Sequence, residues 1–171
     1  MKILELPPLE KINKHLSYNP TTGLFTWLIG RPGIGAGKQA GRVRLDGYVD
    51  IKFEYIAYLA HRLAWLFYYG EDPKEKYIDH INLVKDDNRI LNLRTATSTE
   101  NSYNKAGVVK SISGIKGVHW NKRINKWDVK ITHDGKNEFF GSYSCIKEAE
   151  IISVHMRKKL HGEFANFEVP Q

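Results

Sequence analysis

The sequence predicts an α+β fold built from two small domains, and three observations lead to this prediction. Short segments in which apolar and polar residues alternate with period two indicate strands, before residue 54 and again after residue 116. Two longer apolar segments that lack turn residues indicate helices. The stretch 108–115 holds Ser, Gly and Lys but no acid, as linkers often do. We therefore expect a first domain over residues 1–107, a linker over 108–115 and a second domain over 116–171.

The N-terminal region combines turn signals with short strands. Residues 1–17 predict a short helix or arm, and Asn19-Pro20 predicts a turn before a strand that runs through Phe25, Trp27 and Ile29. The glycine-rich segment 30–41 has the composition of a phosphate-binding loop but not its spacing, because Gln39 stands where that motif needs Ser or Thr. A hairpin tip is the better interpretation.

A strand and a buried helix follow. In "GYVDIKF" every second residue from Val49 to Phe53 is apolar, which places one face of a strand in the core. "YLAHRLAWLFYYG" is too long and too poor in turn residues for a strand, and it predicts a mostly buried helix that stops at Gly70. His61 and Arg62 are its only strongly polar side chains. They fit either a core histidine beside a snorkelling arginine, or a role beside the site that follows.

Residues 77–107 predict strand, loop, strand and helix in that order. "YIDHI" and "LRTAT" are the strands, and the polar loop "NLVKDDNRILN" joins them. Thr97 and Glu100 have the spacing of a capping box, so a helix begins there, and Gly107 is its expected stop.

Three residues in this stretch could form a catalytic site. Asp79 and His80 are strand neighbours, so their side chains point to opposite faces and have different tasks. Asn101, in the first helical turn, could share a metal ion with Asp79, since two oxygen ligands with open positions suit Mg²⁺ or Mn²⁺. His80, with an ordinary pKa of roughly 6.5, could deprotonate a water. The alternative is that the Asp-His pair and the asparagines only populate a polar loop.

Charge and cysteine content narrow the partners and the compartment. The chain has a net charge of +7 and a pI near 9.4, which favours an anionic partner such as nucleic acid or an anionic membrane, although a solvated surface has the same composition. No apolar run approaches the roughly 20 residues that span a bilayer, so we expect no membrane association. The single cysteine, Cys145, excludes a structural zinc site that needs two thiolates. We expect a soluble, intracellular protein.

The motif "HRLAW…IDHIN…DNRILNLR…ENSYN" resembles the HNH endonuclease motif of phage-encoded and homing-type nucleases. The resemblance implies a ββα-metal core in which Asp79 binds a divalent ion, Mg²⁺ or Mn²⁺, and His80 is the general base. It places the family's central asparagine, grouped with the catalytic residues, at Asn92, and its second metal ligand at Asn101. No paired CxxC motifs flank it, which implies a version without structural zinc. Arg62 and Arg94 are candidate phosphate contacts.

The second domain predicts a three-stranded antiparallel sheet packed on one helix. "GVHW", "KWDVKIT" and "EFFGSY" are the strands, and residues 145–161 form the helix. Residues 105–171 carry 12 Lys/Arg against 7 Asp/Glu, so a basic sheet face could enter a DNA groove. An accessory scaffold is the alternative.

This part of the chain resembles the AP2 domain through "KGV", "KW", the "GSY" after the third strand and "HGEFANF". The resemblance implies a DNA-binding module, and its DNA contacts fall on Lys116, His119, Lys122, Arg123, Lys130 and Thr132. The turn before Lys126 holds one residue more than the family pattern, so the match is weaker at Lys122 and Arg123 than at the four sheet positions. Plant-type arginines are replaced by His119 and Thr132, so no sequence preference transfers.

Together these features predict a metal-dependent endonuclease that cuts double-stranded DNA. A single set of active-site residues predicts a monomer that nicks one strand at a preferred site, in the cytoplasm of a bacterial host if a phage encodes it. A non-catalytic, sequence-specific DNA-binding protein with an HNH scaffold is the rival interpretation, and a nuclease for structured RNA is a third.

Overall fold

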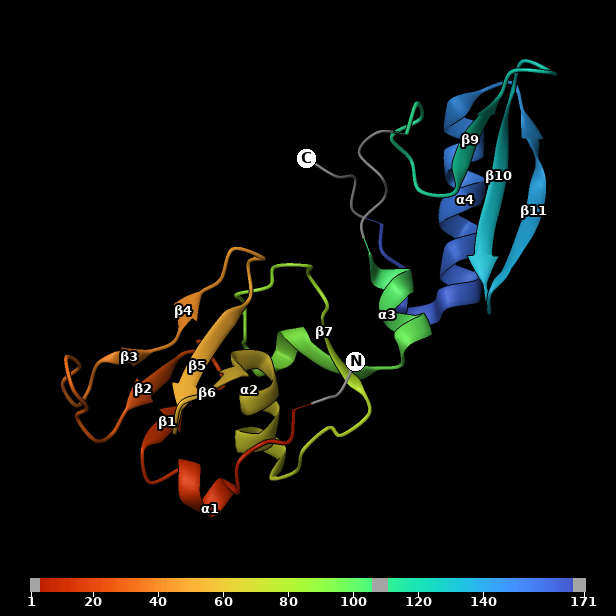
Figure 1. Cartoon of the computed structure of the whole chain (residues 1–171). Coiled ribbons are helices and arrows are strands. Elements are labelled where there is room, and N and C mark those ends of the chain that lie inside the picture. The colour runs from red at the N-terminus through yellow and green to blue at the C-terminus, as the bar shows by residue number, and fades with distance from the viewer. Residues whose placement is uncertain (1–3, 106–110, 168–171) are drawn as a thin grey trace. The chain divides into compact units, whose positions relative to one another are not determined.

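The computed structural model describes residues 4–105 and 111–167 of the 171-residue chain. They form two compact units, Met1–Thr97 and Ser98–Gln171, which are labelled by element in Figure 1. Both units combine helices with small antiparallel sheets, which confirms the α+β class. The units divide before the predicted boundary at 107. That residue and residues 108–110 of the predicted linker lie outside the described residues.

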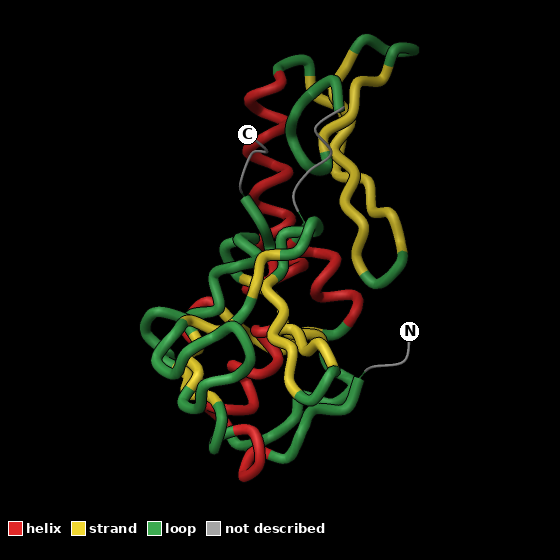
Figure 2. Tube along the Cα trace, turned by 60° about the vertical axis from the view of Figure 1, so that its left-hand side comes forward, coloured by secondary structure: helices red, strands yellow, loops and turns green. Residues whose placement is uncertain are grey.

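The first unit contains three small sheets, and short strands joined by longer loops make up most of it (Figure 2). In sheet order its elements are the strands β1 (Leu16–Tyr18), β2 (Phe25–Trp27) and β3 (Gln39–Ala40); β4 (Arg42–Val43), β5 (Val49–Phe53) and β6 (Ile56–Leu59); and the pair β7 (Tyr77–His80) and β8 (Leu93–Ala96). Its helices are α1 (Leu9–Ile12), α2 (Ala60–Tyr69) and the 3₁₀ turn Ile90–Asn92.

A single apolar core joins these sheets to α2. Phe25, Ile51, Leu63 and Ile78 are buried members that come from β2, β5, α2 and β7. The predicted helix is confirmed, and it ends as predicted at Gly70, whose φ of 76° is the left-handed conformation that suits glycine. The core therefore fixes α2 against β5 and β7.

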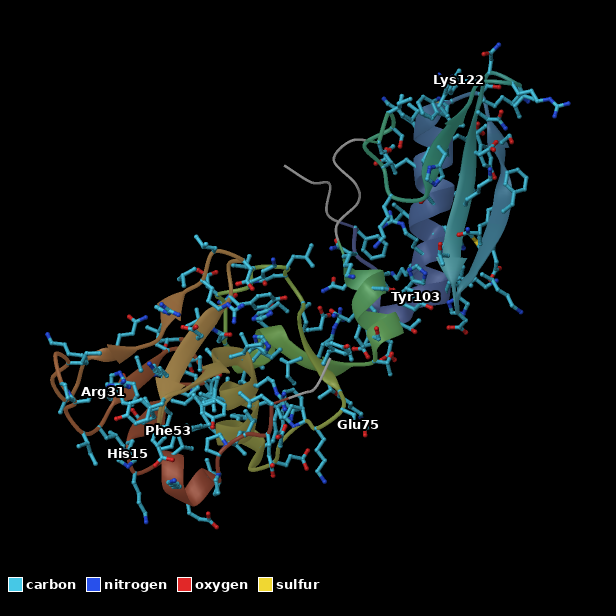
Figure 3. The ribbon with its side chains drawn as sticks, in the orientation of Figure 1. His15, Arg31, Phe53, Glu75, Tyr103 and Lys122 are labelled. Atoms are coloured by element: carbon cyan, nitrogen blue, oxygen red, sulfur yellow. The ribbon has the colours of Figure 1, made fainter. Side chains whose placement is uncertain are left out.

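The second unit is a three-stranded antiparallel sheet with α4 (Ile146–His161) packed along one face (Figure 1). Its strands are β9 (Val118–Asn121), β10 (Lys126–His133) and β11 (Lys136–Tyr143), with β10 in the centre. Val118, Val129 and Ile131 form the core with Ala149 of the helix. Lys122 lies on the turn between β9 and β10, as Figure 3 shows.

Asp128 departs from the alternation that the sequence predicts for β10. The alternation places it on the outer face, yet it is only 4% exposed. Its carboxylate accepts hydrogen bonds from Ser142, Asn121 and Lys130, of which the bond from Ser142 Oγ is 2.6 Å long. These bonds lower the pKa of Asp128 despite burial. A polar network therefore covers part of this face.

Helix α3 (Ser98–Asn104) belongs to the second unit. The ring of Tyr103 stacks on His161 with 3.9 Å between centroids and 5° between planes, and Asn166 Nδ2 donates to the backbone carbonyl of Asn104. Within the described residues, no helix has the length and apolar character to cross a membrane.

Candidate active site

The β7–β8 hairpin brings the predicted catalytic residues into one buried region. Antiparallel pairing sets Asp79 opposite Arg94 and His80 opposite Leu93. Both Asp79 and His80 are buried, at 5% and 4% exposure, next to Ile78 of the same strand, which belongs to the apolar core. Burial of two adjacent polar residues on one strand is costly unless both have partners.

Asp79 forms an ion pair with Arg94 across the hairpin. Arg94 Nε and Nη2 lie 2.9 Å and 2.8 Å from Asp79 Oδ2, and the two side chains are 12% and 6% exposed. This contact orients the carboxylate. Because of this ion pair, Arg94, a predicted phosphate contact, lies directly beside Asp79, a predicted metal ligand.

His80 is held by the loop. Its Nε2 lies 3.3 Å from Asn88 Oδ1, and Asn88 Nδ2 donates to the carbonyl of Asp86, so the amide oxygen faces the ring. A neutral ring that donates Nε2–H to Asn88 carries its lone pair on Nδ1. Burial lowers the pKa of His80, and the bond to Asn88 and the nearby carboxylates offset only part of that shift.

Two aromatic rings pack against His80, and the sequence did not identify them as a group. The His61 ring lies 5.1 Å from the His80 ring at 88°, and Tyr48 lies 5.3 Å from His61 and 5.9 Å from His80. Burial lowers the pKa of His61 to about 3, and its Nδ1 is buried without a hydrogen-bond partner. The sequence signal was the lone histidine in an apolar helix. The structure places it at the site.

Asn88 is another residue whose contact with His80 the sequence did not reveal. Its turn role was predicted, and its bond to Asp86 agrees with that role, but its contact with His80 was not predicted. Several asparagines lie close together in this part of the sequence, and their spacing alone does not show which of them contacts His80.

Asn92 braces the loop from within. Its Oδ1 accepts from the backbone N–H of Asn82 at 3.0 Å, and its Nδ2 donates to the carbonyl of Asp87 at 2.8 Å. The bonds close the loop on itself, as the family resemblance implies for this asparagine. Whether Asn92 also takes part in catalysis stays a prediction.

The N-terminal sheet supports the same loop from outside. Tyr18 Oη donates to the carbonyl of Asn88 at 2.7 Å. Gly23, with φ at 74°, approaches so closely that a Cβ there would lie 2.5 Å from Arg89 N and 2.6 Å from Asn88 C. Only glycine fits both the backbone angle and this contact.

The donor chemistry of the predicted metal ligands fits a hard divalent ion. Asp79 offers a carboxylate oxygen and Asn101 an amide oxygen, the ligand types that Mg²⁺ and Mn²⁺ prefer. Asn101 lies on α3 in the second unit, so its pairing with Asp79 stays a prediction. Among the described residues, no three His, Cys, Asp or Glu side chains are grouped to hold a metal. A site here therefore depends on the amide and on solvent or substrate oxygens.

The predicted DNA contacts have different surroundings. Arg62 pairs with Asp72 and donates to the carbonyl of Leu4, so its side chain is 12% exposed. In the second unit, four predicted contacts line one cavity of about 430 Å³, namely Lys116, His119, Lys130 and Thr132. Lys122 and Arg123 are exposed on the β9–β10 turn.

Lys116 is the most constrained of these residues. Its Nζ donates to the carbonyls of Tyr103 and Lys105 at 2.7 Å and 2.6 Å. Burial, with the nearby charges of Arg157 and Lys105, lowers its pKa to about 8. It therefore contributes to the C-terminal end of α3 as well as to the cavity.

Comparison with known proteins identifies relatives of the chain. The family model of the HNH endonuclease matches residues 58–103, which run from β6 through α2 and the β7–β8 hairpin into α3. Protein 3.8 of Escherichia phage T7 is 36% identical over 107 residues, which cover 63% of this chain and 88% of that protein. An uncharacterized HNH endonuclease, L560, of Acanthamoeba polyphaga mimivirus is 28% identical over 149 residues, which cover 85% of this chain and 68% of the relative. No solved structure matches.

Proposed function

Because the chain belongs to the HNH endonuclease family and is a nuclease, we propose that it hydrolyses phosphodiester bonds of double-stranded DNA with the help of a divalent metal ion. The observation that carries the proposal is the buried His80 ring, oriented by Asn88 beside the Asp79–Arg94 pair. A general base needs a neutral imidazole in a fixed orientation, and burial favours the neutral form.

His80 acts on the attacking water. Its Nδ1 accepts the proton while the water oxygen attacks phosphorus in line with the leaving 3′ oxygen. Asn88 Oδ1 lies 3.3 Å from Nε2, a contact that favours the tautomer with the proton on Nε2 and the lone pair on Nδ1. Asn92 keeps the loop closed, so that Asn88 stays in position.

Asp79 and Asn101 are the proposed metal ligands. A divalent ion held there, Mg²⁺ or Mn²⁺, supplies electrostatic stabilisation for the charge that develops on the phosphoryl and leaving oxygens. Arg94 holds the Asp79 carboxylate in one orientation through two contacts to Oδ2. Arg94 and Arg62 are the proposed phosphate contacts in this unit.

We propose further that the protein acts as a monomer that nicks one strand at a preferred site. It carries one His80 and one Asp79, so one encounter cuts one bond. Its second unit, with an AP2-like sheet, would bind DNA through the basic residues listed above and bias where the first unit cuts. The homing-type resemblance and the phage relative favour a role in mobile or phage DNA, in the cytoplasm of a bacterial host.

Nicking of supercoiled plasmid tests the proposal. Wild-type protein with Mg²⁺ or Mn²⁺ is expected to convert supercoiled plasmid to open circles, and EDTA is expected to stop the conversion. His80→Ala is expected to bind the same DNA in a gel shift and to nick it ~10²–10⁴-fold more slowly, the typical contribution of a general base. His155→Ala is the matched control, because His155 is an exposed histidine of α4.

The outcomes separate the rival functions. DNA binding without metal-dependent nicking by the wild type would favour a non-catalytic DNA-binding protein. Cleavage of structured RNA in preference to duplex DNA would favour an RNA nuclease. Undiminished nicking by His80→Ala, with the His155→Ala control also active, would remove His80 as the base.

A further inference from the structure

The hairpin between β4 and β5 ends in a fully exposed leucine, Leu45. Val43, on the same hairpin, is 63% exposed. The turn is tight: Arg44 N–H donates to the carbonyl of Tyr48 at 2.7 Å, and Gly47 N–H donates to the carbonyl of Arg44 at 2.9 Å. A single exposed apolar side chain is common at protein surfaces, so what distinguishes this tip is its charged surroundings and its place beside the β7–β8 loop.

Cations surround this tip. Arg44 contacts Asp46 through Nε and Nη2 at 3.2 Å and 3.0 Å, and Arg42 pairs with Asp50 while its own side chain stays 80% exposed. The Arg44–Asp46 pair is exposed on both sides, at 43% and 48%, and such pairs contribute little, so a phosphate could share the Arg44 guanidinium. The Asp50 carboxylate is only 7% exposed, but the Arg42 side chain itself reaches solvent. The flanks of the tip therefore suit an anionic partner, and a single apolar tip is too small for a stable protein interface.

The hairpin is tied to the catalytic loop. Lys85 Nζ, on the loop between β7 and β8, donates to the carbonyl of Asp46 at 2.9 Å and lies 5.0 Å above the Tyr48 ring. Tyr48 in turn lies 5.9 Å from His80 between ring centroids. The tip is thus held in place beside the catalytic base.

We propose that this hairpin is a DNA wedge: Leu45 enters the minor groove and partly unstacks a base step near the phosphate that is cut, while Arg42 and Arg44 contact the flanking phosphates. The inference rests on the proposed function. Isolated apolar side chains flanked by arginine are the means by which many proteins kink DNA from the minor groove. Leu45 is three residues from Tyr48, a chain reach of at most about 11 Å, or roughly three base steps.

Nicking assays test the wedge first. Leu45→Ser is expected to nick plasmid ~10-fold more slowly or worse, because serine lacks the apolar side chain that would occupy the unstacked base step, whereas Leu45→Met is expected to retain activity. Ile151→Ser is the matched control, since it removes an exposed isoleucine from α4. The Leu45 side chain is fully exposed, so the melting temperature of Leu45→Ser is expected to equal that of the wild type.

Unstacking is then measured directly. Primer extension on nicked plasmid locates the cut, and 2-aminopurine is placed in turn at each step within four positions of it. His80→Ala protein is expected to raise the fluorescence at one of these steps. The fluorescence increase is expected to disappear in the double variant His80→Ala with Leu45→Ser. It is expected to remain in the double variant His80→Ala with Ile151→Ser.

Each outcome has one meaning. Normal nicking by Leu45→Ser, or a fluorescence increase that survives this substitution, would overturn the wedge and leave the nuclease intact. Failure of the wild type to nick with either metal would overturn the proposed function instead. A wild type that sediments as a dimer, with Leu45→Ser as a monomer of unchanged fluorescence response, would assign the tip to a second copy of the chain.

Discussion

The ring of His61 lies edge-on to the ring of His80, with 5.1 Å between their centroids and 88° between their planes. His61 is 5% exposed and comes from the buried face of α2, whereas His80 ends β7. In a buried site, two protonated imidazoles this close together would repel each other, and burial would add a desolvation cost. The contact therefore favours neutral rings, the form that the proposed base requires.

Acid is expected to destabilise the protein through His61. The folded-state pKa is lowered to about 3, while the unfolded chain titrates near 6.5. The unfolded state therefore binds the proton first, and stability falls as the pH drops from 6.5 towards 3. At pH 5 the loss from this residue is about 2 kcal/mol relative to pH 7.5.

Urea unfolding at pH 7.5 and pH 5 measures this effect. His61→Phe keeps a ring in the core but cannot titrate, so it is expected to lose about 2 kcal/mol less on acidification than the wild type. His155→Phe, which replaces an exposed histidine, is expected to behave as the wild type does. Equal acid sensitivity of His61→Phe and the wild type would contradict the prediction.

The Asp79–Arg94 pair is expected to matter for stability as well as for the site. Arg94→Met removes the ion-pair partner of the Asp79 carboxylate, which is 6% exposed. Removing one partner of a buried pair lowers the free energy of unfolding by roughly 3–5 kcal/mol. Adding Asp79→Asn is expected to recover part of that cost, because the buried charge is gone, without restoring nicking. Urea midpoints of the two single variants and the double variant give the coupling energy, and a coupling near zero would show that the pair does not act as a unit.

Asn92 is expected to be needed for loop order. Asn92→Ala removes two hydrogen bonds that close the loop, at a cost of roughly 2 kcal/mol. The nicking rate is expected to fall even under conditions in which the variant is still folded, since Asn88 then loses its fixed position against His80. Asn13→Ala, at an exposed asparagine after α1, is the control. Full activity in Asn92→Ala would separate the loop bonds from catalysis.

The turn between β9 and β10 is expected to contribute to DNA affinity by charge. Lys122→Gln with Arg123→Gln removes two exposed cations, so the slope of log K against log salt is expected to become shallower by about 2. Fluorescence anisotropy with His80→Ala protein over a range of KCl concentrations measures the slope without cleavage. Lys158→Gln with Lys159→Gln, on exposed positions of α4, controls for net charge. If the two double variants had identical slopes, the change would reflect net charge alone, and the turn between β9 and β10 would have no particular role in DNA binding.

Periodic elements of the fold were predictable from sequence because their pattern reports local geometry. The buried helix that ends at Gly70 and the strands on either side of the 81–92 loop follow from residue spacing and turn chemistry alone. The helix predicted over residues 145–161 does as well, and its apolar face packs on the second core.

Contacts between elements were not predictable in the same way. Nothing in the spacing places His61 of α2 and Tyr48, before β5, against His80, because that meeting depends on how the core packs. Likewise, a capping box can begin α3 but cannot say which core the helix joins. Tyr103, by stacking on His161, joins it to the second unit.

The close approach of Gly23 to the catalytic loop limits how such a nuclease can be rearranged. The segment that the family model matches starts at residue 58, so an exchange of that segment alone would separate the loop from Gly23 and from the Tyr18 hydroxyl. Any protein that received the segment would need a glycine at the position of Gly23 and a hydroxyl within hydrogen-bond distance of the Asn88 carbonyl. Recombination that keeps residues from Leu16 to Ala96 together preserves these contacts, so the N-terminal sheet and the β7–β8 hairpin would have to be inherited as one segment.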